Sequence, residues 1–245
     1  MAESMSEITV TPLTNVSQLR DGPIMSMTAQ QRRSLSQGRF VDIVVLNNDG
    51  TLESAAGRMT LAAARKAFQV VNSHLCDLEK AGANIAYINK IIVPGVIPEA
   101  LSRIIDFVKF CVNDCNGPIG AMRSDQTDRV PLYHNVLVAE AAIAVGFKHG
   151  YEDAKSKIER TYYKGGAHRY RMPIDDVKAI AAANLRTPFS ESVKSKILTS
   201  VAAAYLDGHL NAGQEVDDYM NANARFNQAV LAEQARIEAE RADAN

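Results

Sequence analysis

The residue types that most often perform chemistry in proteins are scattered along this chain. Its five histidines stand singly, at His74, His134, His149, His168 and His209. None of them forms the HxxxH or HxH spacing that brings two imidazoles to one metal ion. Cys111 and Cys115 are four residues apart on an expected helix and share a face, but with His134 they supply only three ligands. Buried apolar cysteines are the better interpretation, and we predict no metal site.

Other catalytic motifs are missing or lack the necessary context. The Asn-Asn-Asp-Gly segment is a hairpin turn and Gly-Pro-Ile-Gly follows a helix, so neither resembles a phosphate-binding loop. The acid pairs Asp175-Asp176 and Asp217-Asp218 lie near expected helix starts, where the helix dipole explains them without catalysis. The segment TYYKGGAHRYR combines tyrosines with basic residues, and we interpret it as an exposed linker rather than an anion-binding patch. We therefore predict no catalytic residue and no cofactor.

The composition narrows the class of protein. The chain has 245 residues, 47% of them hydrophobic, which is enough to bury a sizeable core. Its formal charge of −1 argues against a dedicated nucleic-acid binder. No apolar run approaches the roughly 20 residues that span a bilayer, and the N-terminus lacks the pattern of a signal peptide. We expect a protein of the cytoplasm, the nucleus or both, which binds neither nucleic acid nor membrane.

The elements that would position a site follow from the hydrophobic pattern. Residues 1–37 are rich in Ser, Thr and Gln and predict a flexible N-terminal arm, in which SEITVTPL has the alternation to add a strand. FVDIVVLNNDGTLES then predicts a β-hairpin, RMTLAAARKAFQVVNSHL a helix, and NIAYINKIIVPG another strand. Pro98 and Glu99 suit the first turn of a helix whose apolar face runs to Val112.

The second half of the chain predicts helices. A polar loop over residues 113–131 precedes two helices, LYHNVLVAEAAIAVGF and HGYEDAKSKIERTYYK. After Gly165-Gly166 the pattern is helical throughout, with segments expected near residues 173–184, 188–207 and 214–240. The last is interpreted as a surface helix rather than a coiled coil, because its apolar positions span too few heptads.

Residues 40 to about 160 resemble the BTB/POZ domain. The matching segments, in order, are FVDIVV, MTLAAARKAF, IIVPGVIPEALSRIIDFVKF and VLVAEAAIAVGFKHGYED. The helical region after them resembles the tail of small fungal members. The resemblance implies an α+β fold: a BTB/POZ-like core with a small, mostly three-stranded sheet flanked by helices, followed by an all-helical C-terminal region. The implied boundaries are an arm at 1–37, the domain at 38–163 and the extension at 164–245.

If an interface exists, we expect it at the first strand and the first helix after the hairpin, together with the N-terminal arm, since arms of this family often pair across a dimer. The resemblance therefore implies an interface in which five residues take part: Asp42, Met59, Leu61, Arg65 and Phe68. Gly57 stands where most members have a histidine, so the family's Asp–His arrangement is present only through Asp42. Some members bind a cullin through a hydrophobic–acidic element, for which Leu75–Asp77 and Leu78-Glu79 are the candidates.

Three functions are weighed. The first, which we favour, is a non-catalytic BTB/POZ-type module that acts through homo- or hetero-oligomerisation as an adaptor or scaffold. The second is an adaptor subunit of a cullin-RING ubiquitin ligase. The polar loop over residues 113–131 and the C-terminal helices favour this function. The third, an enzyme, would need a pocket lined by a pair among His134, His149, Glu140 and Asp106. The absence of a reactive constellation favours a protein that binds other proteins.

Overall fold

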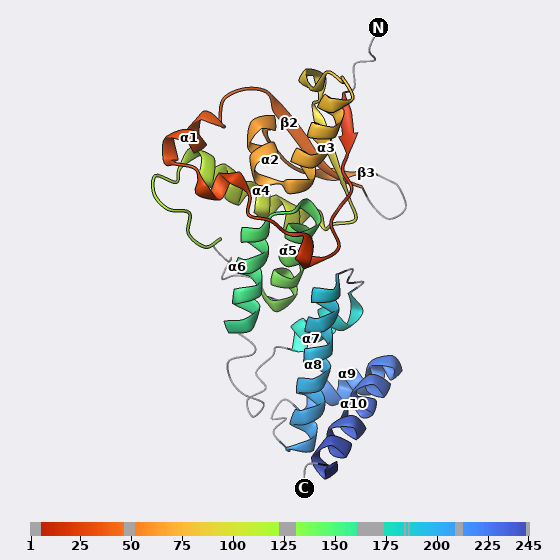
Figure 1. The fold of residues 1–245 in the computed structure, drawn as a ribbon. Coiled ribbons are helices and arrows are strands. Elements are labelled where there is room, and N and C mark those ends of the chain that lie inside the picture. Colours follow the sequence, from red (N-terminus) through yellow and green to blue (C-terminus); the bar gives the residue numbers. More distant parts are fainter. Residues whose placement is uncertain are drawn as a thin grey trace. The chain divides into compact units, whose positions relative to one another are not determined.

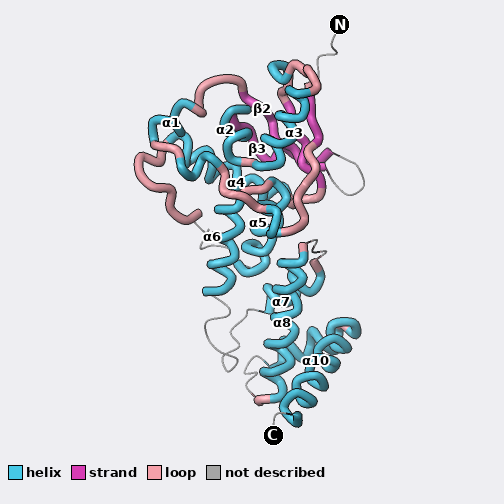
Figure 2. Tube along the Cα trace, in the orientation of Figure 1, coloured by secondary structure: helices cyan, strands magenta, loops and turns pink. Residues whose placement is uncertain are grey.

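A computed structural model describes residues 6–46, 52–122, 131–160, 174–183, 185, 187–208 and 213–243. The chain divides into two compact units. The sheet unit comprises residues 1–124 and 137–155, and the helical unit comprises residues 125–136 and 156–245. All strands of the described residues belong to the sheet unit, whereas the helical unit contains helices and their connections (Figures 1 and 2). The expected α+β class, with helices following a sheet-and-helix core, is confirmed.

The sheet has four strands in the order β1-β4-β2-β3. Their bounds are β1 Glu7–Thr9, β2 Phe40–Leu46, β3 Leu52–Thr60 and β4 Lys90–Pro94. Strands β2 and β3 pair antiparallel, which confirms the predicted hairpin, although its turn lies outside the described residues. Strand β4 runs parallel to β2 on one side and to β1 on the other.

The sequence predicted a flexible arm over residues 1–37. In the structure this N-terminal segment belongs to the sheet unit. Its predicted strand exists as β1 and pairs with β4 of the same chain. Backbone hydrogen bonds from Asn89 N to Ser6 O, 2.8 Å, and from Val10 N to Ile92 O, 3.0 Å, extend this pairing at both ends. The short strand is therefore the fourth of a sheet that the sequence predicted as mostly three-stranded.

Besides its strands, the sheet unit contains, within the described residues, four whole helices and most of two more. Their bounds are α1 Ala29–Ser34, α2 Leu61–Ala67, α3 Gln69–Lys80, α4 Pro98–Asn113, α5 Pro131–Val145 and α6 Lys148–Ile158, with 3-10 turns at Val16–Gln18, Pro23–Ser26 and Ile85–Tyr87. The first residues of α5 and the last of α6 are assigned to the helical unit. As predicted, α4 begins at Pro98 with Glu99 in its first turn.

The helix predicted over residues 58–75 is wrong in its start and its continuity. Strand β3 continues to Thr60, whose side chain then accepts a hydrogen bond from Ala63 N and caps α2. The helix breaks at Phe68, which has an extended backbone between α2 and α3. The Phe68 ring is buried and meets the Phe147 ring edge to face, with centroids 6.2 Å apart. This long-range ring contact helps hold the extended backbone of Phe68 in place, so the break reflects tertiary packing rather than local helix propensity.

One face of the sheet forms the core of this unit together with α4. The inward side chains of β2 are Val41, Ile43 and Val45, and all three are buried. Helix α4 packs against β3, and Ile105 of α4 lies against Gly57 of β3. A Cβ at Gly57 would lie 3.0 Å from Cγ2 of Ile105, so any larger side chain there would press on α4. The space beside α4 gives a physical reason for glycine at this position.

A buried arginine fastens the N-terminal segment to the end of α4. The Arg32 side chain, on α1, is only 2% exposed. Its guanidinium donates to four backbone carbonyls: Met27 O at 2.6 Å, Cys111 O at 3.0 Å, Cys115 O at 3.0 Å and Gly117 O at 2.6 Å. The carbonyls at the C-terminal end of a helix lack intrahelical partners and carry the negative end of its dipole. Arg32 therefore completes the end of α4.

The helical unit is built on four further helices. Their bounds are α7 Ile174–Ala182, α8 Pro188–Leu206, α9 Gly213–Ala222 and α10 Ala224–Asp243. The single helix predicted over residues 214–240 is divided at Asn223, whose side chain accepts a hydrogen bond from Phe226 N at 3.1 Å and caps α10. Phe226, Val230 and Ile237 bury the inner side of α10 in a core shared with α8.

Candidate interaction surface

The five residues of the predicted interface lie in two different environments. Asp42 is exposed on β2, Leu61 is partly exposed on α2, and Arg65 follows on the same helix. Met59 and Phe68 are only 2% and 1% exposed, so both side chains belong to the core of the sheet unit. The inclusion of Met59 and Phe68 is corrected accordingly, because neither offers surface to a partner in this conformation. An interface through Asp42, Leu61 and Arg65 stays a prediction.

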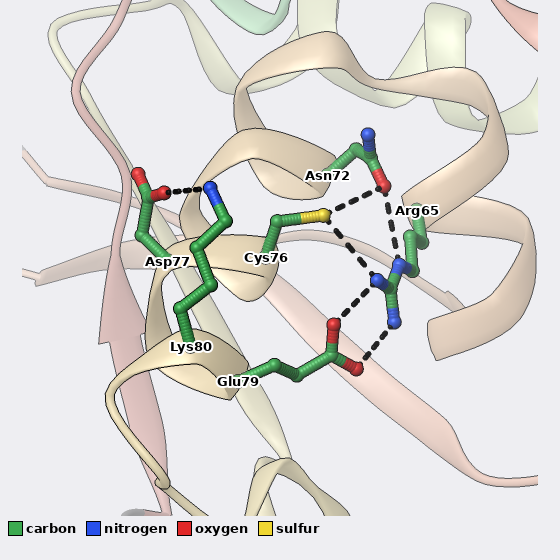
Figure 3. A network of polar contacts seen from close by, with 6 residues as sticks. All are labelled: Arg65, Asn72, Cys76, Asp77, Glu79 and Lys80. Carbon is green, nitrogen blue, oxygen red and sulfur yellow. Dashed lines mark hydrogen bonds and ion pairs between the residues drawn. The ribbon is translucent and has the colours of Figure 1, made fainter.

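Arg65 is the centre of a polar network between α2 and α3 (Figure 3). Its guanidinium binds both carboxylate oxygens of Glu79, at 2.8 and 2.6 Å. It also donates to Asn72 Oδ1 at 3.1 Å and contacts Cys76 Sγ at 3.4 Å. The hydrogen bonds from Arg65 lower the pKa of the Glu79 carboxyl, which stays ionised and fixes the fork of the guanidinium.

This network defines what Arg65 does in the folded chain. Because Phe68 separates α2 from α3, the Arg65–Glu79 pair joins the two helices across the break. Figure 3 shows the Asp77–Lys80 pair of α3 apart from this network. Lys80 Nζ lies 3.3 Å from Asp77 Oδ1. Arg65 is therefore committed to an internal contact, and the two candidate cullin-binding segments are also constrained, since Leu75 is buried and Glu79 is paired.

The outer face of the sheet carries a row of alternating charges. The strand register places Glu7, Lys90, Asp42 and Arg58 side by side across β1, β4, β2 and β3. Lys90 Nζ lies 2.8 Å from Glu7 Oε2, and Arg58 Nε lies 3.6 Å from Asp42 Oδ1. Read across the sheet, the signs are negative, positive, negative and positive. We call these four residues the charge row.

The exposed aromatic side chain of Phe40 lies beside the charge row, and Tyr87 is joined to the residue before it, Arg39. The Phe40 ring is 48% exposed at the start of β2, with the Arg58 guanidinium 5.5 Å from its centroid. Arg39 donates to the carbonyl of Tyr87 at 2.9 Å, and the Tyr87 side chain is 53% exposed. We call Arg39, Phe40, Asp42, Arg58 and Tyr87 the Phe40 surface. Aromatic residues and arginine are the types most enriched where protein interfaces derive their affinity.

Sequence reasoning selected Asp42 but missed Phe40 and Arg58. The signal was present, because side chains two residues apart on a strand share a face, and Phe40 therefore lies on the side of Asp42. Arg58 required knowledge of the register, which pairs Asp42 with Arg58. That register depends on two irregularities in the β2–β3 ladder, and no local pattern announces them.

The groups with catalytic potential have structural partners. The His149 ring stacks on Phe107 with centroids 5.6 Å apart, and its Nε2 lies 3.1 Å from Gly120 O. Asp106 pairs with Lys109 at 3.1 Å. Burial raises the pKa of the Cys111 thiol to about 12, in line with the prediction of a core cysteine. The same prediction is wrong for Cys115, which is half-buried and lies beyond the end of α4. The predicted linker TYYKGGAHRYR lies outside the described residues.

Clusters of metal-binding side chains and membrane-spanning helices are both missing from the part of the chain that the structure describes. Within the ranges given above, no three His, Cys, Asp or Glu side chains gather as a metal site would require. None of the helices traced there is long and apolar enough to cross a bilayer. Comparisons of the chain with family models, curated proteins and solved structures found no match.

Proposed function

We propose that this chain is a non-catalytic protein–protein interaction module of BTB/POZ type, which acts as an adaptor or scaffold through homo- or hetero-oligomerisation in the cytoplasm or nucleus. The observation that carries the proposal is the Phe40 surface. It combines exposed Phe40 and Tyr87 with Arg39 and Arg58 on a strand and its neighbouring segments. A rigid element presents such side chains with little loss of entropy on binding.

The charge row favours a second copy of the chain as one partner. If a second sheet faces the first across a two-fold axis parallel to the strands, the order of the row is reversed. Glu7 then faces the partner subunit's Arg58, and Lys90 faces the partner subunit's Asp42. Every charge of the row meets an opposite charge, as an isologous interface requires of a self-complementary surface. A two-fold axis along the row would instead place equal charges opposite each other.

Light scattering coupled to size exclusion tests the homo-oligomer directly. We expect the full chain to be dimeric at high concentration and Phe40→Ser to be monomeric. Phe110→Ser is the matched control, because Phe110 is 47% exposed on α4 and lies outside the Phe40 surface. A wild-type chain that is monomeric at every concentration, or a Phe40→Ser dimer, would refute the homo-oligomer.

Hetero-oligomerisation requires a second experiment. Affinity purification with wild type and Phe40→Ser should recover protein partners that the variant loses. The cullin-RING adaptor is the alternative function, and it predicts a cullin among the proteins retained by both. If the variant retains every partner of the wild type, the Phe40 surface is not the binding site.

A further inference from the structure

The helical unit contains a cavity of about 810 Å³ between α7, α8 and α10. Its apolar wall includes Ile180 of α7, Leu198 of α8 and Phe226 of α10. Protein interiors are close-packed, and voids much larger than a water molecule are few. A volume of this size lies in the range of ligand sites, which measure about 300–1,000 Å³. Since Ser195 and Arg225 on its rim are exposed, it opens to solvent as a groove.

The two basic side chains on the rim of the groove, Lys194 and Arg225, are not paired with acidic residues of the described part of the chain. Within that part, Glu191 is the one acid among the lining residues. Two arginines of this unit, in contrast, have acidic partners. Arg236 binds Glu233 at 2.6 Å, and Arg241 binds Asp207 at 2.9 Å. The groove thus presents apolar surface beneath a net positive rim.

The shape of the groove restricts the backbone of an occupant. Five α8 residues line it, and four of them, Glu191, Lys194, Ser195 and Leu198, are spaced i, i+3, i+4 and i+7 along one face beside Ile197. That face extends about 10 Å, or two helical turns. Most of the wall is helical, with Ala183, Leu185 and Asn223 contributed by connections, and none of the lining residues belongs to a strand. The groove therefore offers no sheet edge to which an extended peptide could pair. An occupant must satisfy its own backbone, as a helix does.

We propose that the groove binds an amphipathic helical segment of a partner protein. Its apolar anchors, repeated at i, i+3 or i+4, and i+7, lie over partly exposed apolar side chains of the lining: Ala181 of α7, Leu198 of α8 and Ala229 of α10. An acidic side chain at its flank faces Lys194 and Arg225. A helix is favoured over an acyl chain because the groove is open along its rim, where a lipid tail would remain in contact with water. The site is carried by the helical unit and is independent of the Phe40 surface.

A displayed library tests the proposal with the full chain. The library presents a short helix in which the anchor positions and one flanking position on each side are randomised. Selection on the wild-type chain should enrich apolar residues at the anchors and Asp or Glu at the flanks. Enrichment of Lys or Arg at the flanks, or no enrichment, would overturn the proposal. Stoichiometric binding of oleate without any enriched helix would assign the groove to a lipid and overturn it as well.

Matched variants locate the binding of the enriched peptide. Ser195→Phe fills the groove and should weaken binding in fluorescence anisotropy at least about tenfold, whereas Ser192→Phe on the same helix, exposed and outside the groove, should not. Lys194→Glu should weaken binding about three- to tenfold, and Lys66→Glu in the sheet unit should leave it unchanged. Equal binding by Ser195→Phe and wild type would refute the site.

Discussion

Replacing Arg32 tests whether a buried cation with carbonyl partners alone stabilises the sheet unit. The guanidinium donates four hydrogen bonds and is 2% exposed, and no carboxylate among the described residues pairs with it. Cys115 N bonds to Phe110 O, so Cys111 O, which would accept from Cys115 N in a continuing helix, accepts from Arg32 instead. Removing the arginine leaves this end of α4 without its partner.

The magnitude follows from the balance of two terms. A hydrogen bond to a charged group contributes about 1.5–3 kcal/mol, and four of them are not additive. Burying the guanidinium costs several kcal/mol, which Arg32→Met recovers. We expect a net loss of about 3–5 kcal/mol in the free energy of unfolding for Arg32→Met, because four carbonyls lose their donor at about 1–3 kcal/mol each and the recovered desolvation offsets only part of this. Arg32→Lys should be less severe, because it keeps the charge but loses the planar fork.

Urea unfolding followed by far-ultraviolet circular dichroism measures this effect. A loss of about 4 kcal/mol lowers the unfolding midpoint by roughly 2 M at a slope of about 2 kcal/mol/M. Arg33→Met is the control, since the Arg33 side chain is exposed and contacts only Asn116, and it should change stability by less than about 0.5 kcal/mol. Hydrogen exchange over residues 98–117 should rise in Arg32→Met alone. Equal stability of the two variants, or a more stable Arg32→Met, would refute the argument.

Further predictions concern close backbone approaches and one carboxylate. Gly57→Ala should destabilise the sheet unit by about 1–3 kcal/mol, because its Cβ presses on Ile105, and wild-type stability in thermal unfolding would contradict this. Gly146→Ala should lower the free energy of unfolding by about 2–4 kcal/mol, since the φ of Gly146 is +72° and the new Cβ would lie 2.5 Å from Gln69 Cβ. Gly82→Ala is the control, because Gly82 also has a positive φ but has open space around it. Equal melting temperatures of the two variants would disprove the steric part of the argument. Hydrogen bonds from Arg236 and Thr199 lower the pKa of the Glu233 carboxyl to about 2, against an ordinary value of 4.5. The ionised Glu233 therefore stabilises the folded chain fully above pH 4.5, and this contribution is lost as the pH falls toward 2. Glu233→Gln should flatten this part of the stability–pH curve, and an unchanged curve would show that Glu233 is not responsible.

Elements with a strong local signal were predictable from the sequence. Pro98 and Glu99 begin α4, and the apolar face behind them needs no tertiary information. The Asn-Asp-Gly segment between two apolar runs was enough to predict the β2–β3 hairpin. In these segments the turn chemistry and the hydrophobic period agree with the fold, which is the condition for reliable inference.

Features fixed by distant contacts were missed. Phe68 interrupts a helix-like pattern because its ring packs on Phe147, nearly eighty positions later in the chain. Arg32 reads as part of an exposed basic pair, yet its partners lie at the end of α4. The split at Asn223 had a local signal, an asparagine three residues before the first apolar position of α10, but alanine-rich flanks obscured it. For the candidate site, the alternation of side chains along β2 was enough to place Phe40 on the same face as Asp42. Only the strand register shows that Arg58 lies beside them.

The pairing of β1 with β4 also has a consequence for the behaviour of the chain in a crowded solution. With β1 in place, the Ile91-Ile92-Val93 run of β4 has a neighbour on each side, and the edge of the sheet passes to a strand of three residues. Without β1, the unpaired N–H and C=O groups of β4 would form a longer apolar edge, which is a template for strand addition from other molecules. The N-terminal strand thus covers this edge, and cleavage between Thr9 and Pro12 that releases β1 would expose it.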